Sequence, residues 1–244
     1  MGEVSYTPDE LMAIVMARLL ANSENVFVGI SSPLALVASL LAKELYAPDL
    51  TIISVSGAIN PAPERPPKFS THPKLCARCE ALINMPEAFD MCVRGELDTV
   101  LLRGAQVDVS GNLNTSVIGD YERPRVRLPG VAGTAVLMAN AKRVLSWAPK
   151  HEKRVFVKRV DFITGTGRLD RVITPLCVFK MEDGILAVEA LMPDAEPEDV
   201  VKNTGFEVFF LGQEHVRPPM PEELKALRAL DPEGVRRLEF SKRQ

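Results

Sequence analysis

The segment from residue 25 to residue 55 constrains the fold most, because two apolar strands flank a helix there. The runs NVFVGI (25–30) and LTIISV (50–55) are short, apolar and rich in β-branched residues, which is typical of buried strands. Between them, Pro33 opens a stretch in which leucine and valine recur at helical spacing. A strand, a helix and a second strand predict parallel pairing with a right-handed crossover. We therefore expect an α/β fold built on a parallel sheet.

Local signals predict further elements along the chain. Thr7-Pro8-Asp9-Glu10 combines a capping hydroxyl, a proline and a glutamate three residues after the cap, which indicates a helix start. The segment 60–73 holds five prolines and is expected to be a long ordered loop. We expect strands at 99–107, 154–164, 173–181 and 185–192, and helices at 197–203 and 221–230. No internal repeat and no boundary is visible, so a single domain over residues 1–244 is expected.

Composition excludes several classes of function. The chain has 244 residues, of which 46% are hydrophobic and 25% charged, and its net charge is -3. These values are typical of a soluble globular protein and give no basic field for nucleic acid. The uncharged stretch 25–42 is broken by Gly29 and Pro33, and its apolar remainder is too short to span a membrane. We expect a cytoplasmic protein that binds neither nucleic acid nor membrane.

Cysteine and histidine give weak signals. Cys76 and Cys79 form a CxxC without a second pair, whereas a structural zinc site needs about four ligands. They are predicted to be small buried residues on a helix, and no metal is expected. The histidines at positions 72, 151 and 215 are predicted to be surface residues in polar loops.

Glycine is more informative than cysteine or histidine. Five glycines fall within 30 residues, among asparagine, serine and aspartate, at positions 104, 111, 119, 130 and 133. Glycine lets backbone amides approach a phosphate or an oxyanion closely. A set of tight turns is the alternative interpretation.

The order of several motifs resembles the β subunit of class I CoA-transferases, above all glutaconate CoA-transferase. The motifs are Ala47-Pro48-Asp49 with the following strand and Ser56-Gly57, GAQVDVSGNLNTSVIGDY (104–121), GVAGT (130–134), His151-Glu152-Lys153-Arg154, PEDV (197–200) and NTGF (203–206). Together they cover nearly the whole chain.

This resemblance implies an open α/β fold of the CoA-transferase type, with a mainly parallel sheet flanked by helices. It also implies a homologous α subunit, with the active site and the CoA cleft at the contact between subunits. An α2β2 heterotetramer is expected, as is a substrate that carries coenzyme A, with no further cofactor. The expected substrate-binding residues are Ser54, Phe69, Gly104, Gln106, Asn112, Gly130, Val131, Ala132 and Gly133.

One departure from the family pattern bears on function. The transferases carry Glu-Ser-Gly at the end of a strand, and that glutamate attacks the thioester. This chain has Val55-Ser56-Gly57 instead, and these three residues are the candidate catalytic positions. Valine can be neither nucleophile nor base, and a serine without an activating partner is a weak nucleophile. Ordinary CoA transfer through this chain is therefore not expected.

Two kinds of diverged relatives lack that glutamate. One is the decarboxylase of alternative isovaleryl-CoA biosynthesis, which acts on 3-methylglutaconyl-CoA, and the other is a ring-opening hydrolase. The resemblance favours the decarboxylase, with the acyl chain near Val55, Ser56 and Phe69 and the thioester oxygen facing the amides of 131–133. The alternatives are an acyl-CoA hydrolase or a CoA-transferase with its catalytic acid on the α subunit, and a non-catalytic scaffold subunit.

Overall fold

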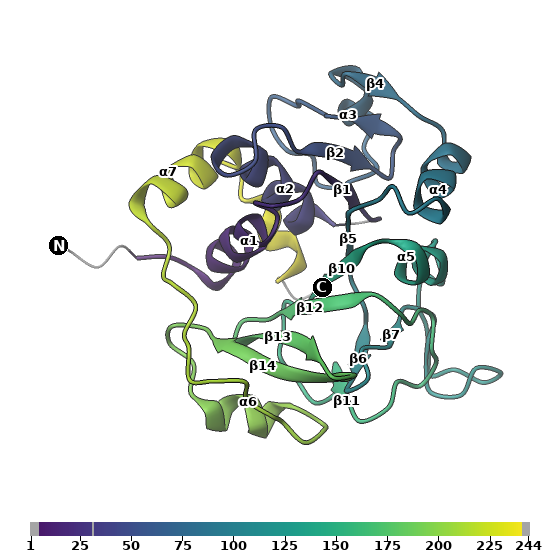
Figure 1. The fold of residues 1–244 in the computed structure, drawn as a ribbon, viewed down its shortest axis with the longest axis vertical. Coiled ribbons are helices and arrows are strands. Elements are labelled where there is room, and N and C mark those ends of the chain that lie inside the picture. The colour runs from purple at the N-terminus through teal and green to yellow at the C-terminus, as the bar shows by residue number, and fades with distance from the viewer. Residues whose placement is uncertain (1–4, 31, 241–244) are drawn as a thin grey trace. The chain divides into compact units, whose positions relative to one another are not determined.

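The computed structural model describes residues 5–30 and 32–240, and the chain forms two compact units (Figure 1). Unit 1 comprises Met1–Met91, Glu96–Leu101 and Pro218–Gln244, and unit 2 comprises Cys92–Gly95 and Leu102–Arg217. A single domain over residues 1–244 stays a prediction, because two compact units can belong to one domain. No helix in the described ranges is long and apolar enough to cross a membrane.

Unit 1 is built on the predicted strand–helix–strand motif. β1 (Asn25–Val28) pairs in parallel with both β2 (Thr51–Ser54) and β5 (Thr99–Leu102). β3 (Ala58–Ile59) and β4 (Ala81–Leu82) extend this sheet by antiparallel pairing beyond β2. The crossover helix α2 (Pro33–Leu45) buries its leucine and valine side chains. The motif predicted from residues 25–55 is therefore confirmed.

Four other helices and a 3-10 helix belong wholly or largely to unit 1. They are α1 (Pro8–Leu19), α3 (Lys74–Ala77), α4 (Met85–Val93), α7 (Pro221–Leu230) and η1 (Val235–Glu239). The backbone amide of Thr7 donates to Oε2 of Glu10 at 3.0 Å, which confirms the predicted helix start. Residues 60–73 contain no helix or strand, so the predicted long loop is confirmed as well.

Four strands of unit 2 lie side by side and form one parallel and two antiparallel pairs. β10 (Arg143–Trp147) pairs in parallel with β12 (Leu169–Ile173), and β12, β13 (Cys177–Glu182) and β14 (Ile185–Leu191) follow as an antiparallel ribbon. Asp183 and Gly184 both have positive φ, at 49° and 83°, which the two-residue hairpin turn requires. The predicted hairpin is confirmed, although β13 begins at Cys177 rather than at residue 173.

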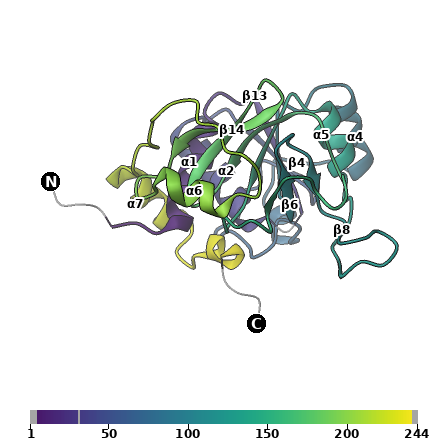
Figure 2. The same cartoon turned by 90° about the horizontal axis from the view of Figure 1, so that it is seen from below.

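Smaller elements complete unit 2. A second sheet joins β11 (Phe156–Val157), β6 (Gln106–Asp108) and β7 (Leu113–Asn114). The strands β8 (Val117–Ile118) and β9 (Val126–Arg127) form a short ribbon, and the loop that joins them extends away from the rest of unit 2 (Figure 2). The helices are α5 (Thr134–Asn140) and α6 (Pro197–Asn203).

Two predicted strands are shorter than expected. The strand predicted at 99–107 is interrupted between β5 and β6, where Gly104 is buried so tightly that a Cβ would meet the Gln106 carbonyl oxygen at 2.9 Å. The strand predicted at 154–164 is reduced to β11. There, the Glu152 carbonyl accepts from the amides of both Val155 and Phe156, which turns the chain. The α/β fold with helices around parallel strands is nevertheless confirmed.

Candidate active site

The turn that follows β2 carries the three candidate catalytic positions. The amide of Gly57 donates to the Ser54 carbonyl at 2.8 Å and closes a tight turn through Val55 and Ser56. Gly57 has φ +89°, and a Cβ at this position would lie 2.2 Å from the carbonyl oxygen of Ile83. Glycine is therefore required here both by the backbone conformation and by the neighbouring chain. The turn ends a buried parallel strand, which is where α/β folds place ligands.

A chain of hydroxyl groups fixes this turn to the proline-rich loop. The Ser56 hydroxyl donates to the Ser54 hydroxyl at 3.0 Å, and the Ser54 hydroxyl donates to the Ser70 carbonyl at 2.7 Å. The Ser70 hydroxyl in turn donates to the Gly29 carbonyl at 2.6 Å, at the end of β1. Ser70 thus links the ends of two parallel strands through the loop, and sequence reasoning did not single it out.

Neither Val55 nor Ser56 has the surroundings of a nucleophile. In the part of the chain that the structure describes, no carboxylate or imidazole forms a hydrogen bond with the Ser56 hydroxyl. The hydroxyl instead donates to Ser54, so no described group of unit 1 withdraws its proton. Val55 is half-buried and offers only methyl groups to its surroundings. At the position where the transferases carry a nucleophilic carboxylate, this turn therefore presents an apolar side chain.

Phe69 lies next to the anchored Ser70 but is itself exposed. Its relative exposure is 55%, whereas Ser70 is fully buried. The loop therefore presents one large apolar side chain outward from a fixed backbone position. Whether a substrate covers Phe69 stays a prediction.

Two of the expected substrate-binding residues, Gln106 and Gly104, lie inside unit 2. The side-chain oxygen of Gln106 accepts from Nδ2 of Asn114 at 2.7 Å and from the Asp161 amide at 3.0 Å. Its nitrogen donates to Asp161 at 3.2 Å, so the polar atoms of Gln106 are occupied. Gly104 is buried beside it. The side chain of Gln106 thus belongs to the framework of unit 2, and substrate binding by Gly104 and Gln106 stays a prediction.

The segment 130–133 has an unusual backbone. Gly130, Ala132 and Gly133 all have positive φ, at 99°, 41° and 86°. Within the described ranges, no oxygen accepts from the amides of Val131, Ala132 or Gly133. The Thr115 hydroxyl donates to the Gly130 carbonyl at 2.8 Å and fixes the start of the segment. Successive amides without acceptors are the groups that can stabilise an oxyanion.

A cleft of about 670 Å³ opens elsewhere in unit 2, and Asn112 is the only expected site residue among those found to line it. The cleft lies where β6 and β11 end, and it is lined by Asp108, Ser110, Asn112, Lys158, Arg159 and Ile163. Sequence reasoning missed its two cations. The alternation of VFVKRV favours a strand, whereas these residues lie in a loop after β11.

His151 is not the surface residue that the sequence predicts. It is 7% exposed, and its ring nitrogens lie 2.9 Å from the hydroxyls of Thr174 and Thr204. Burial lowers the pKa of His151 to about 4. Phe156 and Phe179 flank the imidazole. The buried ring therefore belongs to the core of unit 2. The sequence did not indicate this, because the residues next to His151 are polar.

The prediction for the CxxC pair is partly wrong. Cys76 lies on the single turn α3 and Cys79 follows it, but both are half-buried rather than buried. The helix is too short to bury both positions. Among the described residues, no group of three or more histidine, cysteine or acidic side chains is arranged to hold a metal ion.

The fold is that of a CoA-transferase B-type subunit. The chain belongs to the Coenzyme A transferase family, which it matches over residues 10–203. The B subunit of 3-oxoadipate CoA-transferase from Pseudomonas knackmussii is 34% identical over 93% of this chain and 94% of the relative. The B subunit of glutaconate CoA-transferase from Acidaminococcus fermentans is 27% identical over 93% and 94%.

Two solved structures extend the comparison beyond transferases. The decarboxylase AibA/AibB matches with a TM-score of 0.92 and 29% identity over 97% of this chain and 100% of the other. IpdAB from Rhodococcus jostii RHA1 matches with a TM-score of 0.84 and 27% identity over 98% and 100%. The predicted resemblance is therefore confirmed. Because the relatives are B subunits of two-subunit enzymes, this chain is expected to act with an α subunit.

Proposed function

We propose that this chain is the β subunit of an acyl-CoA decarboxylase that acts on a glutaconyl-type thioester, with 3-methylglutaconyl-CoA as its substrate. The observation that carries the proposal is the turn after β2, where Val55 and Ser56 replace a nucleophilic acid and no base in the described chain activates Ser56. The structural similarity to the decarboxylase AibA/AibB supports the same reaction class.

The proposed reaction needs neither a nucleophile nor a cofactor beyond coenzyme A. The bond between the γ carbon and the carboxylate breaks, CO2 leaves, and the electron pair passes through the double bond to the thioester oxygen. The resulting dienolate takes up a proton from water at the γ carbon and gives a dimethylacrylyl thioester. Atoms and charge balance without an oxidant or reductant.

The low polarity of the turn after β2 supports this reaction. A localised carboxylate is poorly solvated beside the methyl groups of Val55, whereas the delocalised transition state depends less on solvation. Phe69 would add apolar surface on the same unit. The role assigned to Ser56 is to hold the turn through its hydrogen bond to Ser54 rather than to react.

The amides of residues 131–133 are proposed to stabilise the thioester oxygen as it gains charge. Two observations support this proposal. These amides have no acceptor within the described chain, and Gly130, Ala132 and Gly133 have positive φ values. Preorganised donors of this kind contribute about 10²–10³ in rate when they face a developing oxyanion.

An acyl-CoA hydrolase is the second candidate, and an α2β2 assembly is proposed for either reaction. Subunits named cholesterol ring-cleaving hydrolase IpdB are 29% identical to this chain in Rhodococcus jostii and 30% identical in Mycobacterium tuberculosis, which favours this alternative over scaffolding. A hydrolase needs a base to activate water. In this alternative a carboxylate of the α subunit supplies it.

The test is product analysis with both subunits co-purified. The complex is given 3-methylglutaconyl-CoA, and released CO2 and thioester products are measured by mass. Decarboxylation gives equal amounts of CO2 and a dimethylacrylyl thioester with coenzyme A still attached. Free coenzyme A without CO2 would identify a hydrolase of the thioester bond. A requirement for an acceptor acid, or a glutamyl-CoA adduct on this chain, would identify a transferase and overturn the proposal.

A further inference from the structure

Two donors of unit 1 hold the carbonyl groups of the turn after β2. The amide of Ile83, which follows β4, donates to the Gly57 carbonyl at 2.9 Å. The thiol of Cys76, on the single turn α3, donates to the Ser56 carbonyl at 3.7 Å. Cys76 is therefore a direct neighbour of a candidate catalytic position, although the proposed reaction gives it no role.

Cys79 lies beside Cys76 and is held in place by its neighbours in the sequence. Its thiol donates to the Cys76 carbonyl at 3.2 Å. The Arg78 carbonyl and the Glu80 amide both pair with backbone groups of the segment 59–62, at N···O distances of 2.6 and 2.9 Å. The backbone on both sides of Cys79 is thus fixed to a neighbouring segment, whereas α3 is a helix of only four residues.

The four cysteines of the chain differ in their access to solvent. Cys76 and Cys79 are half-buried, whereas Cys92 and Cys177 are buried. Burial raises the pKa of Cys92 and raises the pKa of Cys177 to about 12, so these two thiols stay protonated at neutral pH. Thiol–disulfide exchange needs a thiolate that the other reactant can reach. The pair at Cys76 and Cys79 is therefore the one suited to exchange with a small molecule in solution.

A disulfide between Cys76 and Cys79 would change the contact with the turn in two ways. It removes the thiol hydrogen, so the Ser56 carbonyl loses this donor. It also needs a movement, because Cβ atoms three residues apart in a helical turn are about 5–6 Å apart and a disulfide needs about 3.5–4.5 Å. Since the backbone around Cys79 is paired, α3 is the part that moves, by roughly 1–2 Å.

We propose that Cys76 and Cys79 form a reversible disulfide that loosens the turn after β2 and lowers the activity of the enzyme. The inference rests on the proposed function only in taking this turn as part of the active site. The oxidant is a small-molecule disulfide, represented here by oxidised glutathione.

The exchange takes place in two balanced steps. One cysteine thiolate attacks a sulfur of oxidised glutathione, which forms a mixed disulfide and releases one reduced glutathione. The thiolate of the second cysteine attacks the protein sulfur of the mixed disulfide and releases the other. The two protein thiols lose two electrons and two protons, which the two glutathione thiols carry away. An excess of reduced glutathione reverses both steps.

The test follows the disulfide and the turn separately. The co-purified two-subunit complex is equilibrated at increasing ratios of oxidised to reduced glutathione, its free thiols are blocked with iodoacetamide, and it is digested with trypsin. Trypsin cuts after Arg78, so the two cysteines lie on separate peptides, 75–78 and 79–94, and a disulfide appears as one cross-linked mass. Fragmentation distinguishes Cys79 from Cys92 within the longer peptide.

Oxidation should join the two peptides, reduce the reaction rate at least about fivefold and speed hydrogen exchange of the amides of residues 55–57 at least about threefold. Dithiothreitol should reverse all three changes. Cys79→Ser should keep the activity of the reduced complex and lose the response to oxidation. Cys92→Ala is the matched control, and it should keep both the cross-link and the response.

The contrary results are equally specific. A missing cross-link, or glutathione adducts alone, would show that the two thiols do not meet. A cross-link with unchanged activity and unchanged exchange at residues 55–57 would show that the disulfide does not act on the turn. A loss of activity on oxidation that persists in Cys79→Ser would assign the effect to another group. A cross-link with faster exchange in a complex that releases no CO2 would support the disulfide and overturn only the decarboxylase.

Discussion

Val55 and Ser56 differ in what each substitution should reveal. Ser56→Ala removes a hydroxyl through which no bond or proton passes, so the complex should keep at least about half of its activity. Val55→Asp places a second carboxylate where the substrate carboxylate is proposed to lie, and repulsion of like charges should reduce CO2 release at least tenfold. The measurement is CO2 release from 3-methylglutaconyl-CoA at saturating substrate. Abolished activity in a folded Ser56→Ala complex would instead identify a serine nucleophile or proton relay.

Gly57 offers a test of stability at the same turn. Gly57→Ala combines an unfavourable φ of +89° with a Cβ only 2.2 Å from a backbone oxygen, so a loss of about 2–4 kcal/mol is expected. Gly95→Ala is the matched control, because Gly95 has φ +74° but nothing within 4 Å of the added atom. It should cost about 1 kcal/mol. Urea unfolding measures both, and equal losses would contradict the predicted clash.

The sequence alone identifies some residues of the candidate site and misses others. The missing acid at Val55 is visible in the sequence, since it depends only on residue type within a motif. Ser70 and His151 are not, because their roles depend on partners 41 and 53 residues away in the chain, at Gly29 and Thr204. Lys158 and Arg159 were missed for a similar reason. Only the pairing of β11 with β6 brings them beside Asp108.

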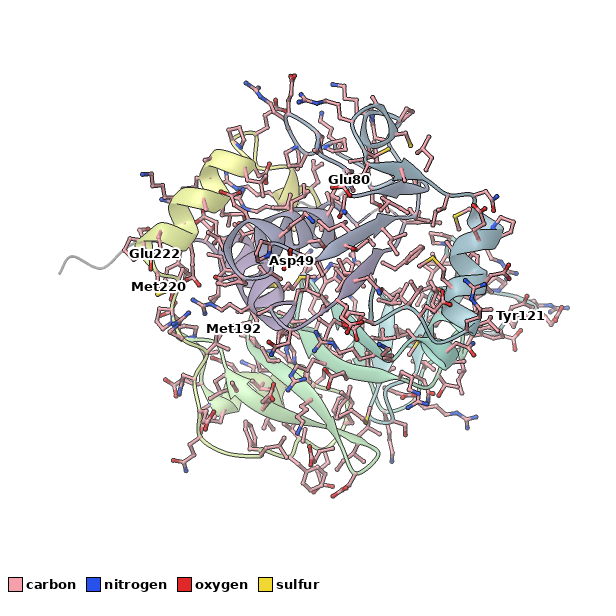
Figure 3. All side chains as sticks on the ribbon, turned by 45° about the horizontal axis from the view of Figure 1, so that its top comes forward. Asp49, Glu80, Tyr121, Met192, Met220 and Glu222 are labelled. Atoms are coloured by element: carbon pink, nitrogen blue, oxygen red, sulfur yellow. The ribbon has the colours of Figure 1, made fainter. Side chains whose placement is uncertain are left out.

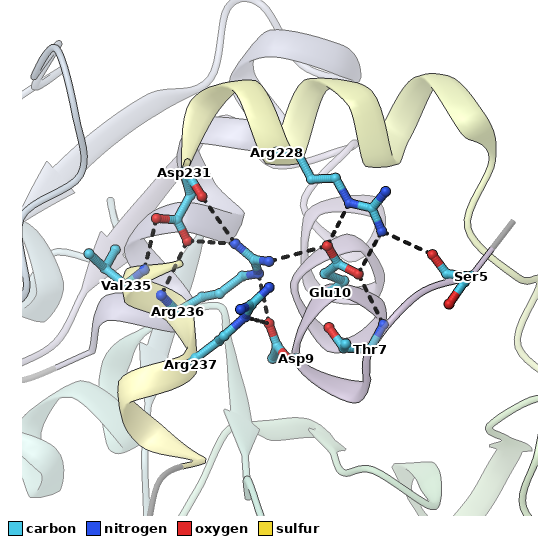
Figure 4. Close-up of polar contacts among 9 residues, drawn as sticks. All are labelled: Ser5, Thr7, Asp9, Glu10, Arg228, Asp231, Val235, Arg236 and Arg237. Carbon is cyan, nitrogen blue, oxygen red and sulfur yellow. Dashed lines mark hydrogen bonds and ion pairs between the residues drawn. The ribbon is translucent and has the colours of Figure 1, made fainter. Parts of the chain in front are cut away.

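At the scale of elements, the attachment of η1 to α1 depends on a buried ion cluster (Figure 4). The Arg236 guanidinium lies 2.8 Å from carboxylate oxygens of Asp9 and of Asp231, and 3.3 Å from Glu10. All four side chains are at most 9% exposed. Two of these carboxylates belong to the first turn of α1, so residues from opposite ends of the sequence are joined here.

Arg236→Ala should destabilise unit 1 by about 3–5 kcal/mol, because it leaves buried carboxylates without their counter-charge. Arg237→Ala is the control from the same helix. Arg237 also pairs with Asp9, at 3.4 Å, but its side chain is 59% exposed, and a loss below about 1 kcal/mol is expected. Hydrogen exchange of α1 in each variant measures the difference. Similar exchange rates in the two variants would contradict the role assigned to the buried cluster.

Elements with strong local signals were predicted, and those defined by distant contacts were not. The cap at Thr7, the Asp183-Gly184 turn and the prolines of 60–73 each act within a few residues, so their elements were recognised. α5 and β10 were missed. α5 begins after the positive-φ residue Gly133, which is equally typical of a loop, and β10 carries a charged residue and a serine among its five residues. Tyr121, labelled in Figure 3, shows the same limit. Its ring stacks on that of Phe162, with the ring centroids 4.8 Å apart, and so joins segments distant in sequence.

For the whole molecule, acid should affect the two units at different pH. His151 in unit 2 has its pKa lowered from 6.5 to about 4 by burial. Glu10 and Glu223 in unit 1 have their pKa values lowered from 4.5 to about 2. Burial is the largest single effect and alone would raise both pKa values, but the hydrogen bonds and charges of the neighbouring arginines, Arg228 for Glu10 and Arg18 for Glu223, outweigh it together with a backbone hydrogen bond to each carboxylate. Each group therefore has a window in which the unfolded chain binds a proton and the folded chain does not.

Stability supplied by neutral His151 is complete above pH 6.5 and is lost as the pH falls toward 4, whereas that supplied by the two glutamates is lost only below 4.5. Between about pH 6.5 and 5, unit 2 should lose about 2 kcal/mol and unit 1 much less. Trp147, the only tryptophan, is buried in β10 and reports unit 2 by fluorescence, and hydrogen exchange reports unit 1. The variant His151→Gln should flatten the response of unit 2. An unchanged slope in that variant would contradict the assignment.

The interleaving of the two units in the sequence also sets an order of events during synthesis. Unit 2 is almost one continuous stretch, whereas unit 1 needs α7 and η1, which follow it in the chain. At roughly 5–20 residues per second, the nascent α1 and α2 wait on the order of ten seconds for those last helices. During that time α1 and α2 can pack against each other, but the parts of both helices that α7 and η1 cover stay exposed to solvent. Unit 2 can already be folded before unit 1 closes.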